Sequence, residues 1–403
     1  MRGLTKDIGT TKAVGALLGL SLSTFIYVTA EMLPIGLLLV ISRDLNVSPS
    51  AVGMLVTGYG LVVVVASVPL TLLTRRVPRR SLVSGVLVTF VVANSLSAAA
   101  SSYWILMGAR LVIALSQALF WSVVVSTASS LFSPYIRGRV IAVVFTGGSL
   151  AAVLGIPLGT WLGQQLGWRI AFLALTGFGV AAAGAVATLL PGGPPEDSPA
   201  THGTTPSVRR YSVLLIVTIL ATTGAFTTFT YITSFLTGLG TFTSEAIGPL
   251  LLARGVAGIL GVAVGGVLVD TRPWLAAVVP LVLQAVALLG LYGFGNAPVV
   301  TIGLVALTGL SFAALNAALA SLVLHVAPGR ADVAGSGAAT ATNVGITVGA
   351  FIGGALLPGP GVRSTALVGG LFSLAALVAA FCGLRPLSPV HRRWALTVFG
   401  WLG

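Results

Sequence analysis

Residues 191–210, PGGPPEDSPATHGTTPSVRR, form the one long polar stretch in a chain of 403 residues. Their content of Pro, Gly, Ser and Thr is typical of a flexible linker. The sequence on either side is apolar: 56% of all residues are hydrophobic, 7% are charged, and the mean hydropathy is +1.05. A soluble domain carries about 25% charged residues. The composition therefore excludes a soluble enzyme and indicates a membrane protein with several spans.

Each side of this polar stretch divides into apolar runs that are long enough to cross a membrane. A bilayer core about 30 Å thick needs roughly 20 apolar residues in a helix. Twelve runs meet this requirement: 13–41, 50–73, 81–101, 103–131, 139–165, 170–190, 212–238, 246–268, 274–294, 297–327, 334–357 and 364–384. We therefore expect an all-α membrane protein with twelve transmembrane helices in two six-helix bundles, residues 1–190 and 212–403, joined by a cytoplasmic linker at 191–211.

Positive charges are distributed unevenly between the two sides of such a bundle. If both termini are cytoplasmic, 16 of the 21 Lys and Arg residues fall on cytoplasmic segments. Three fall on segments at the outer side of the membrane, and Arg110 and Arg254 lie within predicted spans. An excess of this kind is the usual sign of the cytoplasmic side, so we expect both termini to be cytoplasmic. The net charge of +13 then needs no nucleic-acid partner.

The two predicted bundles also resemble each other in sequence. At an offset of 194 residues, Gly155 corresponds to Gly349 and Arg169 corresponds to Arg363. Several matches at nearly the same offset, together with the same predicted topology, favour an internal duplication. Two repeated six-helix halves are typical of transporters whose substrate binds between the halves, near the middle of the membrane.

Glu31 is the acidic residue that the predicted spans place inside the membrane, whereas the other seven lie in loops or at helix ends. A carboxylate in a span costs a few kcal/mol by insertion scales, which makes it a candidate functional residue. Burial raises the pKa of a carboxyl group and a neighbouring cation lowers it, so such a group can titrate near neutral pH. A proton carrier needs this property. A structural ion pair, or a helix end displaced from the membrane, is the alternative.

Arg110 lies about two turns deep in the fourth predicted helix, at the level of Glu31. Gln117 and Trp121 follow it on one helical face, and Tyr27 shares a face with Glu31 on the first helix. We therefore expect Arg110 to pair with Glu31, and the other three side chains to line the same cavity. Simple packing is the alternative for each aromatic residue.

The second half offers fewer polar candidates. Arg254 lies about two turns from the outer end of the eighth helix. Its side chain can enter a cavity or extend outward to the headgroups, and the sequence favours neither. Tyr231 in the seventh helix and Asn316 in the tenth are the matching candidates for a substrate cavity.

Glycines recur at helical spacing in the fifth predicted helix, where Gly155, Gly159 and Gly163 are four residues apart and Pro157 lies between them. Small residues at this spacing let another helix approach closely. A joint that slides between the fifth and eighth helices is one expectation, and static close packing is the other.

Motifs for catalysis and cofactors are missing. The chain has no GxxxxGK[ST] phosphate loop, and its three His and one Cys form no catalytic or metal-binding pattern. We therefore expect a protein that is not an enzyme, needs no cofactor and binds no metal.

Several stretches resemble drug:proton antiporters of the major facilitator superfamily. Residues 148–163, GSLAAVLGIPLGTWLG, are similar to the antiporter motif of the fifth helix. Arg110 with Gln117 resembles the fourth-helix motif. Residues 29–38, TAEMLPIGLL, resemble the first-helix signature of the sugar-efflux and chloramphenicol-resistance branch. The resemblance implies a bacterial inner-membrane antiporter that exports small molecules against inward proton flow.

One motif departs from that family. The family usually has an Asp after the second helix, where this sequence has Thr74 before Arg75 and Arg76. The second-half copy keeps its acid as Asp270. The resemblance thus implies an inner gate of Arg75, Arg76 and Asp270 that lacks the first-half carboxylate.

We therefore predict a proton-coupled secondary active exporter of a small amphipathic molecule, an antibiotic or drug. A sugar efflux transporter or facilitator without a drug role is the alternative. A membrane sensor that transports nothing is a remote one, because no segment is long enough for a soluble output domain. The expected partners are the substrate, protons and the lipid bilayer, and the expected state is a monomer.

Overall fold

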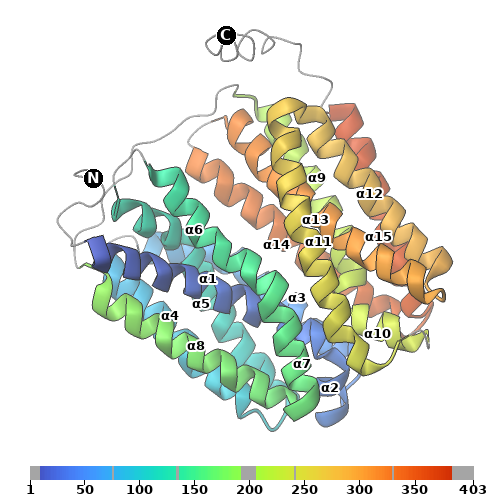
Figure 1. Ribbon diagram of the computed structural model, residues 1–403, viewed down its shortest axis with the longest axis horizontal. Helices are drawn as coiled ribbons and strands as arrows, with labels where there is room; N and C mark the ends of the chain where they lie inside the picture. Colours follow the sequence, from blue (N-terminus) through green and yellow to red (C-terminus); the bar gives the residue numbers. More distant parts are fainter. Residues whose placement is uncertain are drawn as a thin grey trace.

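The computed structural model describes residues 10–74, 77–132, 136–191, 206–239, 242–328 and 331–383, and their regular structure is helical (Figure 1). Within this part of the chain, 12 helices are long and apolar enough to cross a membrane, which confirms the predicted fold class. Most of the predicted linker lies outside the described residues.

The first half, residues 10–191, contains α1 (Thr10–Gly36), α2 (Leu38–Asp44), α3 (Pro49–Thr74), α4 (Arg79–Ala98), α5 (Tyr103–Ser130), α6 (Arg137–Leu150), the π-helix η2 (Ala151–Gly155), α7 (Ile156–Leu166) and α8 (Trp168–Leu189). The second half, residues 206–383, contains α9 (Val208–Phe229), α10 (Ile232–Gly238), the 3-10 helix η3 (Ser244–Ala246), α11 (Ile247–Thr271), α12 (Pro273–Phe294), α13 (Pro298–Val326), α14 (Ala331–Leu356) and α15 (Val362–Gly383).

The first predicted span of each half is broken into two helices. The break falls at Leu37 between α1 and α2, and at Thr230 and Tyr231 between α9 and α10. Leu37 and Tyr231 are 194 residues apart, the offset of the sequence repeat. Pro34 lies just before the first break. Proline lacks the N–H that would bond the carbonyl four residues earlier, and its ring crowds that carbonyl, so the helix weakens here.

The repeat extends to tertiary contacts. A Cβ built on Gly155 would lie 2.1 Å from the Thr29 hydroxyl on α1, and one built on Gly349 would lie 2.6 Å from the Thr223 carbonyl on α9. Gly159 against Leu33 and Gly353 against Thr227 form a second pair of equivalent contacts. These two contacts of the first half thus recur 194 residues later in the second. The duplication is therefore visible in the packing as well as in the sequence.

These contacts correct the expected role of the glycine ridge in the fifth helix. Gly155, Gly159 and Gly163 face Thr29, Leu33 and Leu37 of the first helix, not the eighth. The ridge therefore brings two helices of the same half together, which is the static alternative.

The fifth helix instead meets α11 at its π-helix. A Cβ on Gly255 of α11 would lie 2.6 Å from the carbonyl oxygen of Ala152 in η2. Pro157 lies two residues beyond η2, and its missing N–H removes the donor for the Val153 carbonyl. A π-turn is a common way to accommodate such a loss. The irregular turn is thus one of the places where the second half contacts the first.

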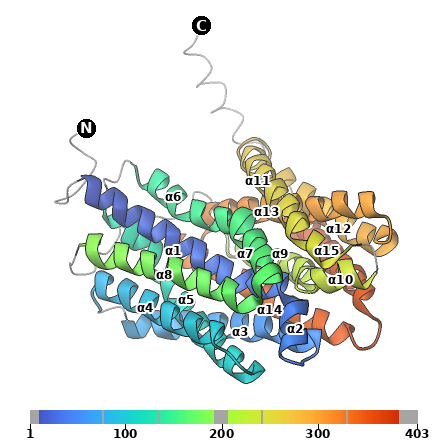
Figure 2. The same ribbon diagram turned by 60° about the horizontal axis from the view of Figure 1, so that its bottom comes forward.

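The two halves meet on the side of the bundle where α2 and α10 lie, which we call the far end; the end where α1 begins and α15 finishes is the terminal end (Figure 1). Ser50 on α3 donates to the Gly354 carbonyl on α14 at 2.9 Å, and Thr233 on α10 donates to the Ile35 carbonyl on α1 at 3.4 Å. Figure 2 shows α3 beside α14 and α7 beside α11. Toward the terminal end, Val65 and Val68 of α3 are exposed.

An apolar cluster seals the contact between the halves. Its buried members from the first half are Ile35, Val56 and Ile156, and those from the second half include Phe226 and Ile346. Phe229 of this cluster also lines a pocket with Arg254, whereas Tyr27 and Trp121 belong to a separate apolar cluster within the first half.

Candidate substrate and coupling site

Glu31 lies on α1 and is 7% exposed, so its carboxylate is shielded from bulk solvent. Its Oε2 accepts a hydrogen bond from Nε2 of Gln117 on α5 at 2.8 Å. Oε1 of Gln117 in turn accepts from the hydroxyl of Tyr59 on α3 at 2.6 Å. Three helices of the first half thus contribute to one chain of hydrogen bonds that ends on the carboxylate.

Arg110 on α5 is fully buried, but it binds the backbone of α1 instead of the carboxylate. Its Nη2 donates to the carbonyl oxygen of Glu31 at 3.0 Å, and its Nη1 donates to the carbonyl oxygen of Ala30. The expected ion pair between Arg110 and the Glu31 carboxylate is not formed among the described residues. The reason is Pro34, which leaves the Ala30 carbonyl without its usual helical donor.

Tyr59 was not predicted from the sequence. Its ring centre lies 4.6 Å from Cζ of Arg110, a cation–π distance. The ring therefore covers the guanidinium while the hydroxyl binds Gln117. The sequence hint is that Tyr59 stands between Gly58 and Gly60 in an otherwise aliphatic span.

The other aromatic candidates of the first half pack away from the carboxylate. The Tyr27 hydroxyl lies 3.1 Å from both the Val86 carbonyl and the Ser116 hydroxyl, and its ring stacks on Phe120. Trp121 stacks on a phenylalanine of α6 with ring centroids 5.9 Å apart. The structure therefore brings Gln117 to Glu31 and gives both aromatic side chains packing partners.

Arg254 on α11 points inward. Its Cζ lies 3.8 Å from the ring centre of Phe229 on α9, and its Nε is buried without a hydrogen-bond partner. The guanidinium lines a pocket with Thr228, Gln284 and Thr308. The sequence left open whether Arg254 enters a cavity or extends to the headgroups, and the geometry corresponds to the cavity.

Tyr231 and Asn316 have different surroundings. The Tyr231 hydroxyl donates to the Ala350 carbonyl at 2.9 Å, and it lies 1.9 Å from the position of a Cβ on Gly53. Tyr231 thus fills the contact between the halves at the far end. Asn316 is half-buried and donates to the Phe312 carbonyl of its own helix at 2.8 Å.

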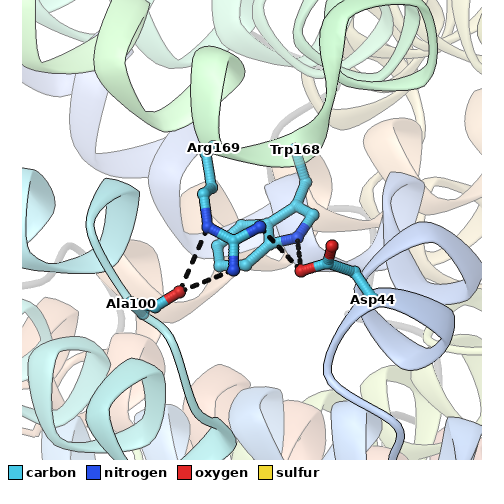
Figure 3. A network of polar contacts seen from close by, with 4 residues as sticks. All are labelled: Asp44, Ala100, Trp168 and Arg169. Carbon is cyan, nitrogen blue, oxygen red and sulfur yellow. Dashed lines mark hydrogen bonds and ion pairs between the residues drawn. The ribbon is translucent and has the colours of Figure 1, made fainter.

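A polar cluster holds the far end of the first half together (Figure 3). The Asp44 carboxylate accepts from Trp168 at 3.0 Å and from Arg169 at 2.7 Å, and Arg169 also donates to the Ala100 carbonyl. The Trp168 hydrogen bond has the largest effect on the pKa of Asp44. Together with the hydrogen bond and charge of Arg169, it holds that pKa below its ordinary value, although burial opposes them. In the second half Arg363 donates to the Tyr292 carbonyl at 2.7 Å.

The side chains of the expected inner gate lie outside the part of the chain that the structure describes. Arg75 and Arg76 lie outside the described residues, and Asp270 lies in the last turns of α11 with its side chain outside the described part. Among the residues that the structure describes, no cluster of His, Cys, Asp or Glu could hold a metal ion.

Comparisons with known proteins point to one family. The family model described as Major Facilitator Superfamily matches residues 20–341. The chain is 31% identical over 380 residues to the "Uncharacterized MFS-type transporter YtbD" of Bacillus subtilis, covering 91% of this chain and 94% of that protein. It is also 31% identical to the "Probable sugar efflux transporter" of Helicobacter acinonychis, covering 89% and 92%.

Solved structures show the same fold at low sequence identity. A bacterial homologue of the human lysosomal transporter Spinster, in an inward-facing and unoccupied conformation, superposes with a TM-score of 0.74 at 13% identity over 95% of this chain and all of that one. The human organic anion transporter MFSD10 superposes with a TM-score of 0.65 at 17% identity, covering 91% and 98%.

Proposed function

The chain belongs to the Major Facilitator Superfamily, and from this premise we propose that it is a secondary active exporter of a small, sugar-like molecule, driven by protons that bind Glu31. The observation that carries the proposal is the buried Glu31 carboxylate on its chain of hydrogen bonds through Gln117 to Tyr59. The relatives named as sugar efflux transporters support the substrate class. They favour it over the antibiotic or drug that the sequence motifs implied.

Protonation of Glu31 would change the hydrogen bonds around it. An ionised carboxylate only accepts, as it does from Gln117, whereas a protonated carboxyl group also donates. If that O–H donates to Oε1 of Gln117, the amide must turn over and the Tyr59 hydroxyl loses its present acceptor. Arg110 stays fixed on the α1 backbone in either state because its partners are carbonyl groups that do not titrate. The titrating group and the fixed cation are therefore separate.

The reorienting group is next to the contact between the halves. Tyr59 precedes Gly60, whose Cβ would lie 2.4 Å from the Thr347 hydroxyl on α14. A shift of α3 at Tyr59 is thus transmitted directly to the second half. This link couples the proton to the movement of the halves that alternating access requires.

The orientation in the membrane follows from the charges. Lys and Arg residues concentrate on the segments of the terminal end, which supports a cytoplasmic location for that end. The halves contact each other at the far end. On this proposal the protein lies in the inner membrane, the far end faces outward, and the contacts there close the path toward the outside.

The test is transport by the purified full-length chain in proteoliposomes with an imposed pH gradient. Radiolabelled glucose and chloramphenicol serve as probes of the two substrate classes. We expect gradient-driven movement of the sugar that Glu31→Gln abolishes, because an amide cannot titrate. Transport of chloramphenicol but not of the sugar would support the drug function instead. Transport at the same rate with and without the pH gradient would exclude proton coupling.

A further inference from the structure

The pocket at Arg254 contains two buried polar groups that lack partners and have complementary chemistry. Nε of Arg254 is a donor without an acceptor, and Oε1 of Gln284 is an acceptor without a donor. Both side chains line the same pocket between α9, α11, α12 and α13. Phe229 and Leu288 form part of its apolar wall.

Arg254 is held in this pocket by its surroundings. Gly309 on α13 lies against it: a Cβ there would be 2.1 Å from the Arg254 carbonyl oxygen and 2.7 Å from its Cγ. The glycine lets α11 and α13 approach closely and leaves room for the stem of the side chain. The face of Phe229 then covers the guanidinium, 3.8 Å from its Cζ. The side chain therefore does not extend to the headgroups.

The charge of Arg254 has no protein counterpart within the described residues. The ion pair found there joins Arg169 to Asp44 at the far end. Arg254 as a residue is partly exposed, but its Nε is buried without an acceptor, and buried polar groups are nearly always paired. A cation in such a place indicates that an anion occupies the pocket during part of the working cycle.

The internal repeat separates this cation from the proton site. Ala225, which lines the pocket, lies 194 residues after Glu31 and occupies the equivalent place in the second half. The second half therefore has an alanine where the first half has its carboxylate, and Arg254 lines the same pocket as this alanine. No side-chain acid competes for Arg254 at that position.

We propose that Arg254 binds the carboxylate or phosphate group of the transported molecule, so that the substrate is an acidic sugar or a similar polyhydroxylated anion. A substrate hydroxyl donates to Oε1 of Gln284, and Leu288 and Leu291 of the apolar wall pack against the carbon skeleton. The guanidinium presents donors in a planar fork that matches both anionic groups. This inference rests on the proposed export function and names its substrate class.

The experiment measures binding of gluconate, glucose 6-phosphate and glucose to the purified full-length chain by calorimetry. Arg254→Gln is the main variant, Arg254→Lys preserves the charge, and Arg43→Gln removes an exposed cation elsewhere as a control. We expect an anionic probe to bind at least about tenfold more tightly than glucose, because hydrogen bonds to charged groups are the strong ones. Arg254→Gln should remove this preference, Arg254→Lys should keep part of it, and Arg43→Gln should leave it unchanged.

Equal binding of gluconate and glucose by the parent chain, or no binding of either anionic probe, would overturn the anion site. So would an unchanged preference in Arg254→Gln or a lost one in Arg43→Gln. If Arg254→Gln does not fold, the Arg254→Lys variant decides. Binding through the planar guanidinium predicts a reduced preference for the anionic probe in this variant, whereas a purely structural role predicts an unchanged preference. Gradient-driven transport in proteoliposomes separates the two proposals. Binding with the stated preference but no gradient-driven export would overturn the function and leave the anion site standing.

Discussion

Arg110 donates a hydrogen bond to the carbonyl oxygen of Ala30, the carbonyl group that the proline four residues later leaves without a helical donor. The break in the first helix therefore supplies the acceptor that the buried guanidinium of Arg110 binds. The cation stabilises the irregular backbone, and the backbone holds the cation beside Glu31 without neutralising its carboxylate.

The first prediction tests this dependence with a double-mutant cycle. Arg110→Ala should lower the free energy of unfolding by about 1–3 kcal/mol, because it leaves buried carbonyl groups without donors. In a Pro34→Ala background the new N–H can bond the Ala30 carbonyl, so the same change should cost less, with a coupling energy of about 1 kcal/mol. Denaturation in detergent measures both. Additive effects would show that Pro34 and Arg110 act independently.

The Glu31 carboxyl group should be required for coupling and not for folding. Glu31→Gln keeps the shape and the contact with Gln117, so its melting temperature should stay close to that of the parent chain. Proton-driven export should fall to background. Glu245→Gln, a change at an exposed acid of η3, is the matched control and should transport normally. Undiminished gradient-driven export by Glu31→Gln would remove this residue from the mechanism.

Two glycines of the fifth and eighth helices should respond differently to enlargement. Gly159 faces Leu33 within the first half, so Gly159→Leu should lower the melting temperature through overpacking that costs typically 1–3 kcal/mol. Gly255 faces η2 across the halves, so Gly255→Leu should prevent closure of the far end.

Labelling of single cysteines at the two ends, with Cys382 replaced, reports which end is open. We expect the far end to become accessible in Gly255→Leu alone. The same labelling pattern in both variants would mean that the π-helix contact does not move.

The cluster around Asp44 should give a small, pH-dependent contribution to stability. The folded-state pKa of Asp44 is lowered, so its stabilisation is present above the unfolded pKa of about 3.9 and is lost as pH falls through the folded value. Side chains of Asp44 and Arg169 are 41% and 39% exposed, so solvent screening limits the effect to about 0.2–1 kcal/mol. Melting temperatures of the parent and Asp44→Asn should differ at pH 7, and the difference should shrink as the pH falls below about 3.9. A difference in melting temperature that stays the same at every pH would show that the effect comes from packing of Trp168.

Hydropathy along the chain determined the spans, the class of fold and the position of Glu31 within the first of them. These properties depend on local composition, because a bilayer selects apolar stretches of one length wherever they occur. The repeat could be predicted for the same reason: residues such as Gly155 and Gly349 are read directly from their spacing.

The partners of those residues were decided by the tertiary structure. A soluble helix shows its buried face through an apolar stripe, whereas these helices are apolar all round and show no such face. The rotation of each helix about its axis was therefore absent from the sequence pattern. That rotation turns Gly159 toward α1, brings Tyr59 onto Gln117, and directs Arg254 into the pocket at Phe229. The same rotation directs Arg110 of α5 toward the backbone of α1. Its hydrogen bonds to the carbonyl groups near Pro34 depend on how the two helices pack, which the sequence pattern does not show.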